Sequence, residues 1–136
     1  MAVARLSGLT APSIADIERL SAAAFAGLPA EFRGLCGDIL FRIEDFPSDD
    51  VLDEMKAEPF DLLGLFQGIG MAEDQAVPAT GRMPNMVFLY RRAILDYWAE
   101  NDETLGAVVT HVLVHEIGHH FGLSDADMEA VERQAG

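Results

Sequence analysis

The segment His115-Glu116-Ile117-Gly118-His119 constrains this chain more than any other stretch. In an α-helix, two histidines four residues apart are separated by about 40° around the axis, so they share one face. That spacing lets both imidazoles bind one zinc ion. The glutamate between them lies on the neighbouring face, within reach of a water molecule beside the metal. The pattern therefore predicts a helix here, and a scaffold that holds this helix rigid.

The residues after this segment offer a third ligand. Catalytic zinc sites commonly have three protein ligands and one open position. Gly122 can take a left-handed conformation and end the helix, and the carboxylate of Asp125 can then turn back towards the metal. The extended pattern H-E-x-x-H-x-x-G-x-x-D is a stronger signal than H-E-x-x-H alone. Asp127 and Glu129 remain alternatives to Asp125.

Two further histidines lie close to the motif. His120 points about 100° away from His119, which makes it less suited to sharing the ion. His111 lies one turn before His115, and its direction differs from that of His119 by about 80°. It can approach the site, but we expect it in the core or behind a metal ligand.

This pattern predicts metal-assisted hydrolysis. Zinc lowers the pKa of a bound water molecule to about 7 and polarises a scissile carbonyl. Glu116 is the expected general base, which takes a proton from the water and passes it to the leaving amine. The competing interpretation is a solvent-facing His-Glu pair whose spacing arose by chance.

Helical and strand patterns alternate along the chain. We expect helices over 14–26 with Ser13 as N-cap, over 29–35, over 50–57 with Ser48 or Asp49 as N-cap, over 93–100, over 103–121 with Asn101 or Asp102 as N-cap, and over 126–134 with Ser124 or Asp125 as N-cap. We expect strands over 38–45 and 86–90, and a strand or hairpin arm over 61–69. Residues 1–12 should be a loose lead-in and residues 70–84 a loop. This order of elements predicts an α+β fold.

Composition limits the class of protein. The length of 136 residues fits one domain over 1–136, and the net charge of −14 argues against nucleic acid and anionic membranes as partners. The single cysteine, Cys36, lies in an apolar segment and should be a small buried hydrophobe. We see no secretory signal and no apolar run of about 18 residues, so we expect a cytoplasmic protein.

The stretch from about 62 to 132 resembles the minimal zincins, small bacterial zincin-like metallopeptidases. The resemblance rests on HEIGHHFGLSDADME, on MPNMVFLYRRAI and on LLGLFQG. It implies an α+β zincin core in which a small mixed sheet packs against helices. It also implies His115, His119 and Asp125 as metal ligands and Glu116 as catalytic base. The motif is similar to the metzincin pattern as well, with Asp125 in the last place.

Other features of these families transfer less directly. Met128 lies too close to the motif to take the role of the metzincin methionine turn. In zincins an edge strand pairs with the extended substrate, and residues 86–90 or 62–67 are the candidates here, unless both are interior strands. Tyr90, Arg91 and Arg92 can stabilise an oxyanion, but we expect ordinary packing or surface roles for them.

Taken together, these patterns predict a zinc-dependent peptidase, expected to be an endopeptidase, that acts on peptides or proteins. The alternative is a non-catalytic zincin-fold binding or regulatory module that keeps the metal site. Glu116 favours catalysis, because a structural zinc site has no use for a base.

Overall fold

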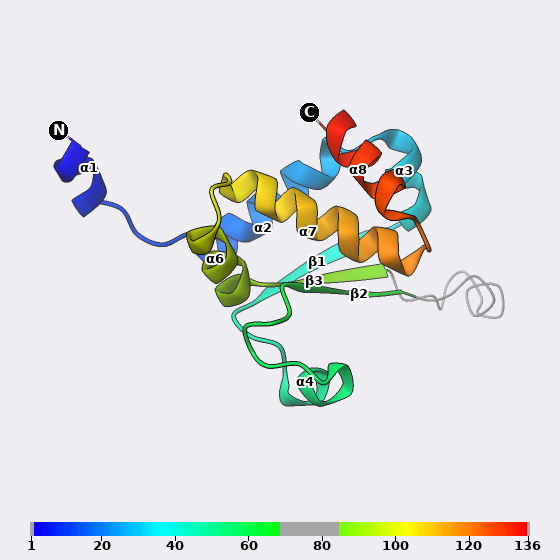
Figure 1. The fold of residues 1–136 in the computed structure, drawn as a ribbon, viewed down its shortest axis with the longest axis horizontal. Helices are drawn as coiled ribbons and strands as arrows, with labels where there is room; N and C mark the ends of the chain where they lie inside the picture. Colours follow the sequence, from blue (N-terminus) through cyan, green and yellow to red (C-terminus); the bar gives the residue numbers. More distant parts are fainter. Residues whose placement is uncertain (1, 69–84, 136) are drawn as a thin grey trace.

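The computed structural model describes residues 2–68 and 85–135, so the loop expected over 70–84 lies outside the described residues. Its elements, shown in Figure 1, are α1 (Ala2–Ser7), α2 (Ile14–Ala26), α3 (Ala30–Cys36), β1 (Ile39–Glu44), α4 (Asp49–Met55), β2 (Gly64–Gln67), β3 (Asn85–Tyr90), α6 (Arg91–Glu100), α7 (Leu105–His120) and α8 (Asp125–Gln134). The mixture of strands and helices confirms the α+β prediction.

The three strands form one mixed sheet in the order β1-β3-β2. β1 pairs with β3 in parallel, and β2 pairs with β3 in antiparallel orientation. Val87 and Leu89 of β3 are completely buried, as a central strand requires. Residues 86–90 therefore do not form an edge strand, whereas β2 is an edge strand among the described residues. Strand order is a non-local property, which is why the sequence left this choice open.

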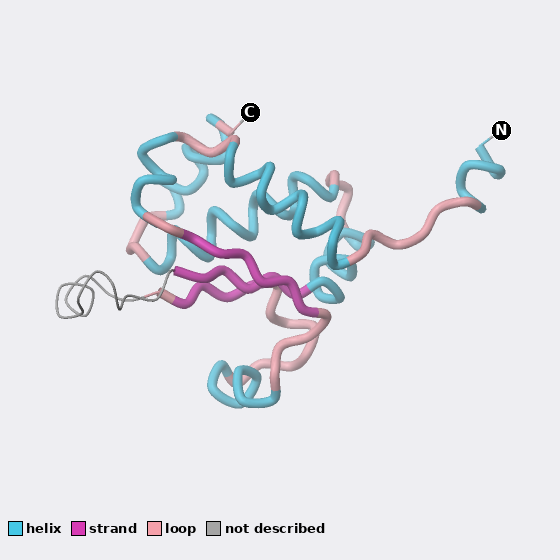
Figure 2. The backbone as a smooth tube through the Cα atoms, turned by 180° about the vertical axis from the view of Figure 1, so that it is seen from behind, coloured by secondary structure: helices cyan, strands magenta, loops and turns pink. Residues whose placement is uncertain are grey.

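Helix α7 is the centre of the hydrophobic core. Its buried residues are Val108, Val109, Val112, Leu113, Val114, Ile117 and Gly118. The helix packs against α2 and against β2 and β3, so α2 and α7 cover one face of the sheet (Figures 1 and 2). These side chains are mostly apolar, and their packing on several sides holds the helix in place.

Two segments differ from the sequence prediction. Residues 2–7 form helix α1 instead of a loose lead-in, consistent with the high helix propensity of its Ala, Arg and Leu residues. Helix α7 is capped by Thr104, whose Oγ1 accepts a hydrogen bond from the Ala107 N–H at 3.1 Å. Asn101 or Asp102 was predicted for that role, but Asn101 ends α6 instead and donates its side-chain N–H to the Tyr97 carbonyl at 2.8 Å.

The turn after α7 directs α8 back along the same helix. Gly122 has a φ of 76°, and the Leu123 N–H donates to the Gly118 carbonyl at 2.9 Å, which is the bond of a Schellman motif. Ser124 then caps α8 in a capping box. Met128 of α8 is completely buried against Gly118, where an added Cβ would lie 2.5 Å from the Met128 sulfur. The predicted stop at Gly122 is thus confirmed.

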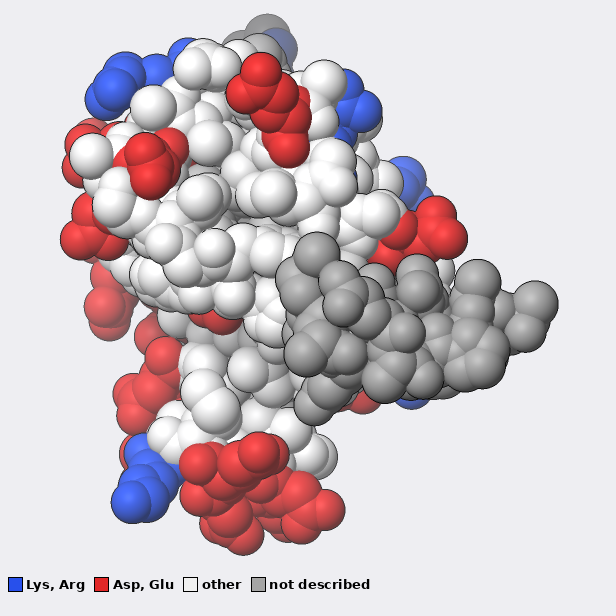
Figure 3. Space-filling view, turned by 90° about the vertical axis from the view of Figure 1, so that its right-hand side faces the viewer, with Lys and Arg blue, Asp and Glu red and all other residues white. Residues whose placement is uncertain are grey.

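Acidic side chains gather on α4, which lies on the opposite side of the sheet from α2 and α7 (Figures 1 and 3). They belong to Asp49, Asp50, Asp53 and Glu54. Part of the net negative charge is therefore separated by the sheet from the helix that carries the His-Glu motif. In the described ranges, no helix has the length and hydrophobicity needed to cross a membrane.

Gly64 marks the closest approach of β2 to α7. A Cβ at this position would lie 2.8 Å from Val112 Cγ1 and 3.0 Å from the Phe88 carbonyl oxygen. Because both neighbours are fixed by packing, we expect Gly64→Ala to lower the free energy of unfolding by about 1–3 kcal/mol. Gly106→Ala in α7, where nothing lies within 4 Å, should leave it unchanged or raise it by up to about 1 kcal/mol. Urea unfolding measures the stability of both variants. Equal stabilities of Gly64→Ala and Gly106→Ala would contradict the prediction.

Candidate metal centre

Three histidines follow one another along α7 at intervals of four residues: His111, His115 and His119. The ring centroids of His111 and His115 are 4.0 Å apart, and those of His115 and His119 are 5.6 Å apart. This places the three rings in a row along one side of the helix. His115 and His119 therefore lie next to each other on one face of α7, as the sequence predicted.

His115 occupies the middle of this row, with 25% of its side chain exposed. Burial lowers its pKa, and the neighbouring His111 and His119 act in the same direction, while Glu132 and Asp125 oppose the shift. A lower pKa favours the neutral imidazole, which is the form that binds a metal. The environment of His115 thus suits a ligand role.

Asp125 is the first residue of α8 and is exposed. Its negative charge acts on His115, so the two groups are within electrostatic reach. Asp127, one of the alternatives, has its carboxylate engaged in the capping box, where it accepts the Ser124 N–H at 3.3 Å. Glu129, the other alternative, is exposed on α8. Of the three acids, Asp125 is the one whose charge contributes to the pKa of the predicted ligand His115.

A tighter cluster lies one helical turn away. Among the described residues, His111, His115 and Glu132 form a group whose ligand atoms all lie within 4.8 Å of one another. Glu132 Oε1 is 2.7 Å from His111 Nδ1 and 4.0 Å from His115 Nε2. His119 and Asp125 do not belong to this group.

Glu132 was missed by the sequence analysis. It lies seven residues after Asp125, so the two acids share one face of α8, and that spacing is the signal that would have found it. His111 was expected in the core or behind a ligand, but its side chain is 49% exposed and it contacts Glu132. It is therefore no core residue.

Glu116 lies on the neighbouring face of α7, where the helix packs against β2 of the sheet. A Cβ added to Gly64 of β2 would lie 3.4 Å from Glu116 Cγ. Burial raises the pKa of Glu116, and the His119 charge partly offsets this shift. Glu116 also contributes, after burial and Glu44, to raising the pKa of Tyr90 to about 12. A carboxylate with a raised pKa is a stronger base than an exposed one.

The raised pKa of Glu116 has a measurable effect on stability. The folded state disfavours the ionised carboxylate, so the wild-type protein loses stability as the pH rises from the ordinary value of 4.5 through the raised value. We therefore expect metal-free Glu116→Gln to be more stable than metal-free wild type at neutral pH, with a difference that shrinks towards pH 4.5. Thermal unfolding in chelator across this range measures it. If metal-free wild type is more stable than metal-free Glu116→Gln at neutral pH, this prediction is wrong.

The remaining candidates have structural contacts. The His120 ring packs against Phe66 of β2 with centroids 4.3 Å apart, so it lies away from the row of three histidines. Tyr90 is buried, Arg91 pairs with Asp45 at 3.0 Å, and the Arg92 guanidinium lies 5.4 Å from the centre of the Phe46 ring. The expected packing and surface roles of these three residues are confirmed.

Cys36 also behaves as the sequence predicted. Its side chain is buried in the hydrophobic core, and burial raises the pKa of its thiol to about 11. A thiol with this pKa is protonated at neutral pH, so it is a poor nucleophile and a poor metal ligand. Cys36 is therefore a core residue.

Comparison with known families agrees with this architecture. A family described as zincin-like metallopeptidase matches residues 36–135, which include the sheet and the His-Glu motif. This protein belongs to the zincin-like metallopeptidase family. The match begins earlier than the resemblance noted over 62–132, because β1 and α4 belong to the family domain as well. A search of curated proteins finds no match.

Proposed function

We propose that this protein is a zinc-dependent peptidase that hydrolyses peptide bonds in peptides or proteins. His115, His119 and Asp125 are the zinc ligands in this proposal, and Glu116 is the general base. One observation carries it: a single turn of α7 presents His115 and His119 on one side, while Glu116 lies against the edge strand β2. Membership of the metallopeptidase family supports the same reaction class.

The donor set fits zinc. Two neutral imidazoles and a carboxylate are typical ligands of catalytic zinc sites. Burial lowers the pKa of His115 and so favours its neutral form, and Asp125 lies in the first turn of α8, where the helix dipole stabilises a carboxylate. When bound, zinc polarises the scissile carbonyl and makes a water molecule more acidic.

Glu116 moves the proton in this reaction. It takes a proton from the attacking water and delivers it to the leaving amine, which cannot depart as an anion. Its partly buried position against Gly64 raises its pKa and so strengthens it as a base. The same position places the carboxylate beside β2.

The edge strand orients the substrate. An extended peptide can add to the outer edge of β2 through backbone hydrogen bonds, which give affinity without dictating sequence. Because Glu116 packs against Gly64 at the start of β2, a peptide bound along Gly64–Gln67 passes close to the base. This arrangement favours internal peptide bonds, as in an endopeptidase.

Metal analysis combined with a cleavage assay tests the proposal. We expect purified protein to contain zinc and to cleave members of a mixed peptide library, detected by mass spectrometry. A chelator should abolish cleavage, and added zinc should restore it. Stoichiometric zinc without chelator-sensitive cleavage would contradict the proposal and favour a non-catalytic zincin-fold module.

A further inference from the structure

The facing sides of α7 and α8 contain two sets of metal-ligand residues rather than one. Along α7, His111, His115 and His119 recur every four residues, and on α8 the acids Asp125 and Glu132 lie about 20° apart around the axis. Helix α8 folds back along α7, since Met128 packs on Gly118 and Glu132 reaches His111. The proposed set of His115, His119 and Asp125 therefore lies near the end of α7, and a second set of two histidines and a carboxylate lies one turn earlier.

The earlier set has distances close to those of a metal site. For bonds of about 2.1 Å in a tetrahedral site, two ligand atoms lie roughly 3.4 Å apart. Glu132 Oε1 lies 2.7 Å from His111 Nδ1 and 4.0 Å from His115 Nε2, and the three ligand atoms are all within 4.8 Å of one another. Small side-chain rotations are enough to bring them around one ion.

We propose that His111, His115 and Glu132 form a second metal position, which takes zinc or another divalent ion that prefers nitrogen and oxygen ligands, such as Co²⁺ or Ni²⁺. It shares His115 with the position used in the proposed reaction. A neutral imidazole has one free lone pair, so His115 serves one ion at a time. An ion at the second position leaves the first with only His119 and Asp125. This effect on activity rests on the proposed function, whereas metal binding itself does not.

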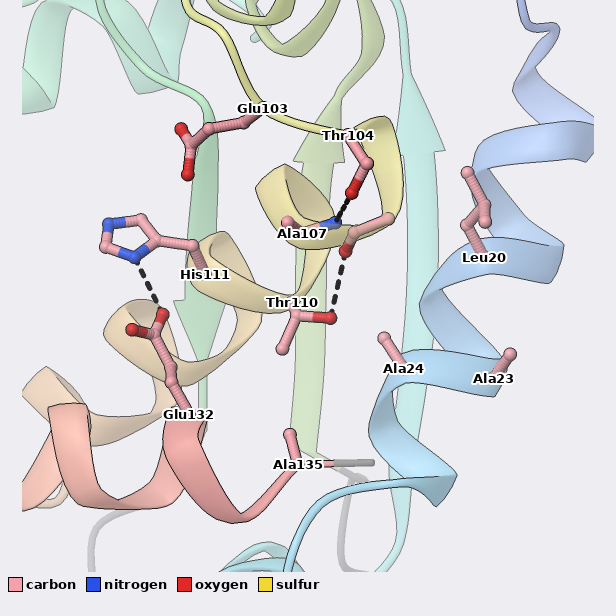
Figure 4. Close-up of a pocket in the computed structure, with 11 residues that line it drawn as sticks. Leu20, Ala23, Ala24, Glu103, Thr104, Ala107, Thr110, His111, Glu132 and Ala135 are labelled. Atoms are coloured by element: carbon pink, nitrogen blue, oxygen red, sulfur yellow. Dashed lines mark hydrogen bonds and ion pairs between the residues drawn. The ribbon is translucent and has the colours of Figure 1, made fainter.

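The second position opens onto a groove. The groove has a volume of about 550 Å³ and lies between α2, α7 and α8, with His111, Glu103 and Glu132 among its lining residues. Figure 4 shows the His111 ring beside Glu132, with Glu103 on the opposite side of the ring. A metal ion can reach the second position from this groove, and so can a water molecule that would serve as a further ligand.

A simple surface ion pair explains less of this arrangement. An exposed His–Glu pair contributes only about 0–1 kcal/mol to stability. It also does not involve His115, whose Nε2 lies 4.0 Å from Glu132 Oε1. A shared metal ion accounts for both contacts of Glu132.

Co²⁺ binding, followed by visible absorption, separates the two positions. His119→Ala/Asp125→Ala keeps only the second set, and His111→Ala/Glu132→Gln keeps only the first. We expect wild type to bind one equivalent of Co²⁺. The His119→Ala/Asp125→Ala variant should also bind one equivalent, with a different spectrum. Adding His111→Ala to that variant should weaken binding by more than about 100-fold, beyond the range for residues that merely support a ligand.

Two results would overturn the second position: no Co²⁺ binding by His119→Ala/Asp125→Ala, or unchanged binding after His111→Ala is added. Two equivalents bound by wild type would contradict the sharing of His115 between the two positions. The substituted residues on α7 and α8 are exposed or half-buried, and circular dichroism checks that each variant folds. The milder His119→Asn/Asp125→Asn variant gives the same test if the alanine variant does not fold. Absence of peptide cleavage would contradict the proposed function alone, because this test measures metal binding.

Discussion

Replacing Glu116 by glutamine should reduce peptide cleavage by about 10²–10⁴-fold, the contribution expected of a general base. Glutamine has nearly the same shape but cannot accept a proton from water at neutral pH. Glu116 packs towards Gly64 and the sheet, on the face of α7 next to the row of His115 and His119, and it is not one of the proposed ligands. The substitution should therefore leave the zinc content unchanged, so that a lost rate reports the missing base.

A matched control separates this effect from a general loss of negative charge. Glu100→Gln, in an exposed residue at the end of α6, makes the same chemical change outside the site and should keep the wild-type rate. Initial rates on one cleaved peptide, with zinc measured in the same samples, provide the comparison. A Glu116→Gln protein that contains zinc and cleaves as fast as wild type would exclude Glu116 as the base.

Met128→Ala should lower the free energy of unfolding by about 2–5 kcal/mol, the range for truncating a buried methionine. Met128 is 0% exposed and fills the space above Gly118, where α8 meets α7. Its removal leaves a cavity at this contact and loosens α8. Because α8 carries Asp125, zinc affinity should fall as well.

Met55→Ala is the control for this substitution. Met55 ends α4 and is 46% exposed, so the same truncation should change stability by less than about 0.5 kcal/mol. Urea unfolding of the two metal-free variants gives the comparison without a contribution from zinc. Equal destabilisation would show that Met128 does not anchor α8.

The local features of the fold were predictable from sequence, since they depend on residues that are close in the chain. Ser13 begins α2 through a capping box, and Gly122 ends α7 with a positive φ, as their residue types indicate. Thr104 was missed because Asn101 is equally suited to capping, and only the end of α6 decides between them. The central place of β3 depends on pairing with segments far away in the sequence.

The same distinction applies to the site. Because His115 and His119 are four residues apart in one helix, their side chains must lie next to each other, and the motif was sufficient to predict this. The contact between His111 and Glu132 joins residues 21 positions apart and depends on how α8 packs on α7. The sequence shows where His111 lies on α7 and where Glu132 lies on α8. It does not specify the angle at which the two helices pack.

Anomalous X-ray diffraction at the zinc edge, on crystals of protein with one equivalent of zinc, tests the central claim most directly. The claim is that the His-Glu motif holds a zinc ion next to Glu116. We predict an anomalous peak at about 2.0–2.2 Å from an imidazole nitrogen of both His115 and His119, with an Asp125 oxygen as third ligand. A zinc ion bound without His119, or no ion at α7, would contradict the claim.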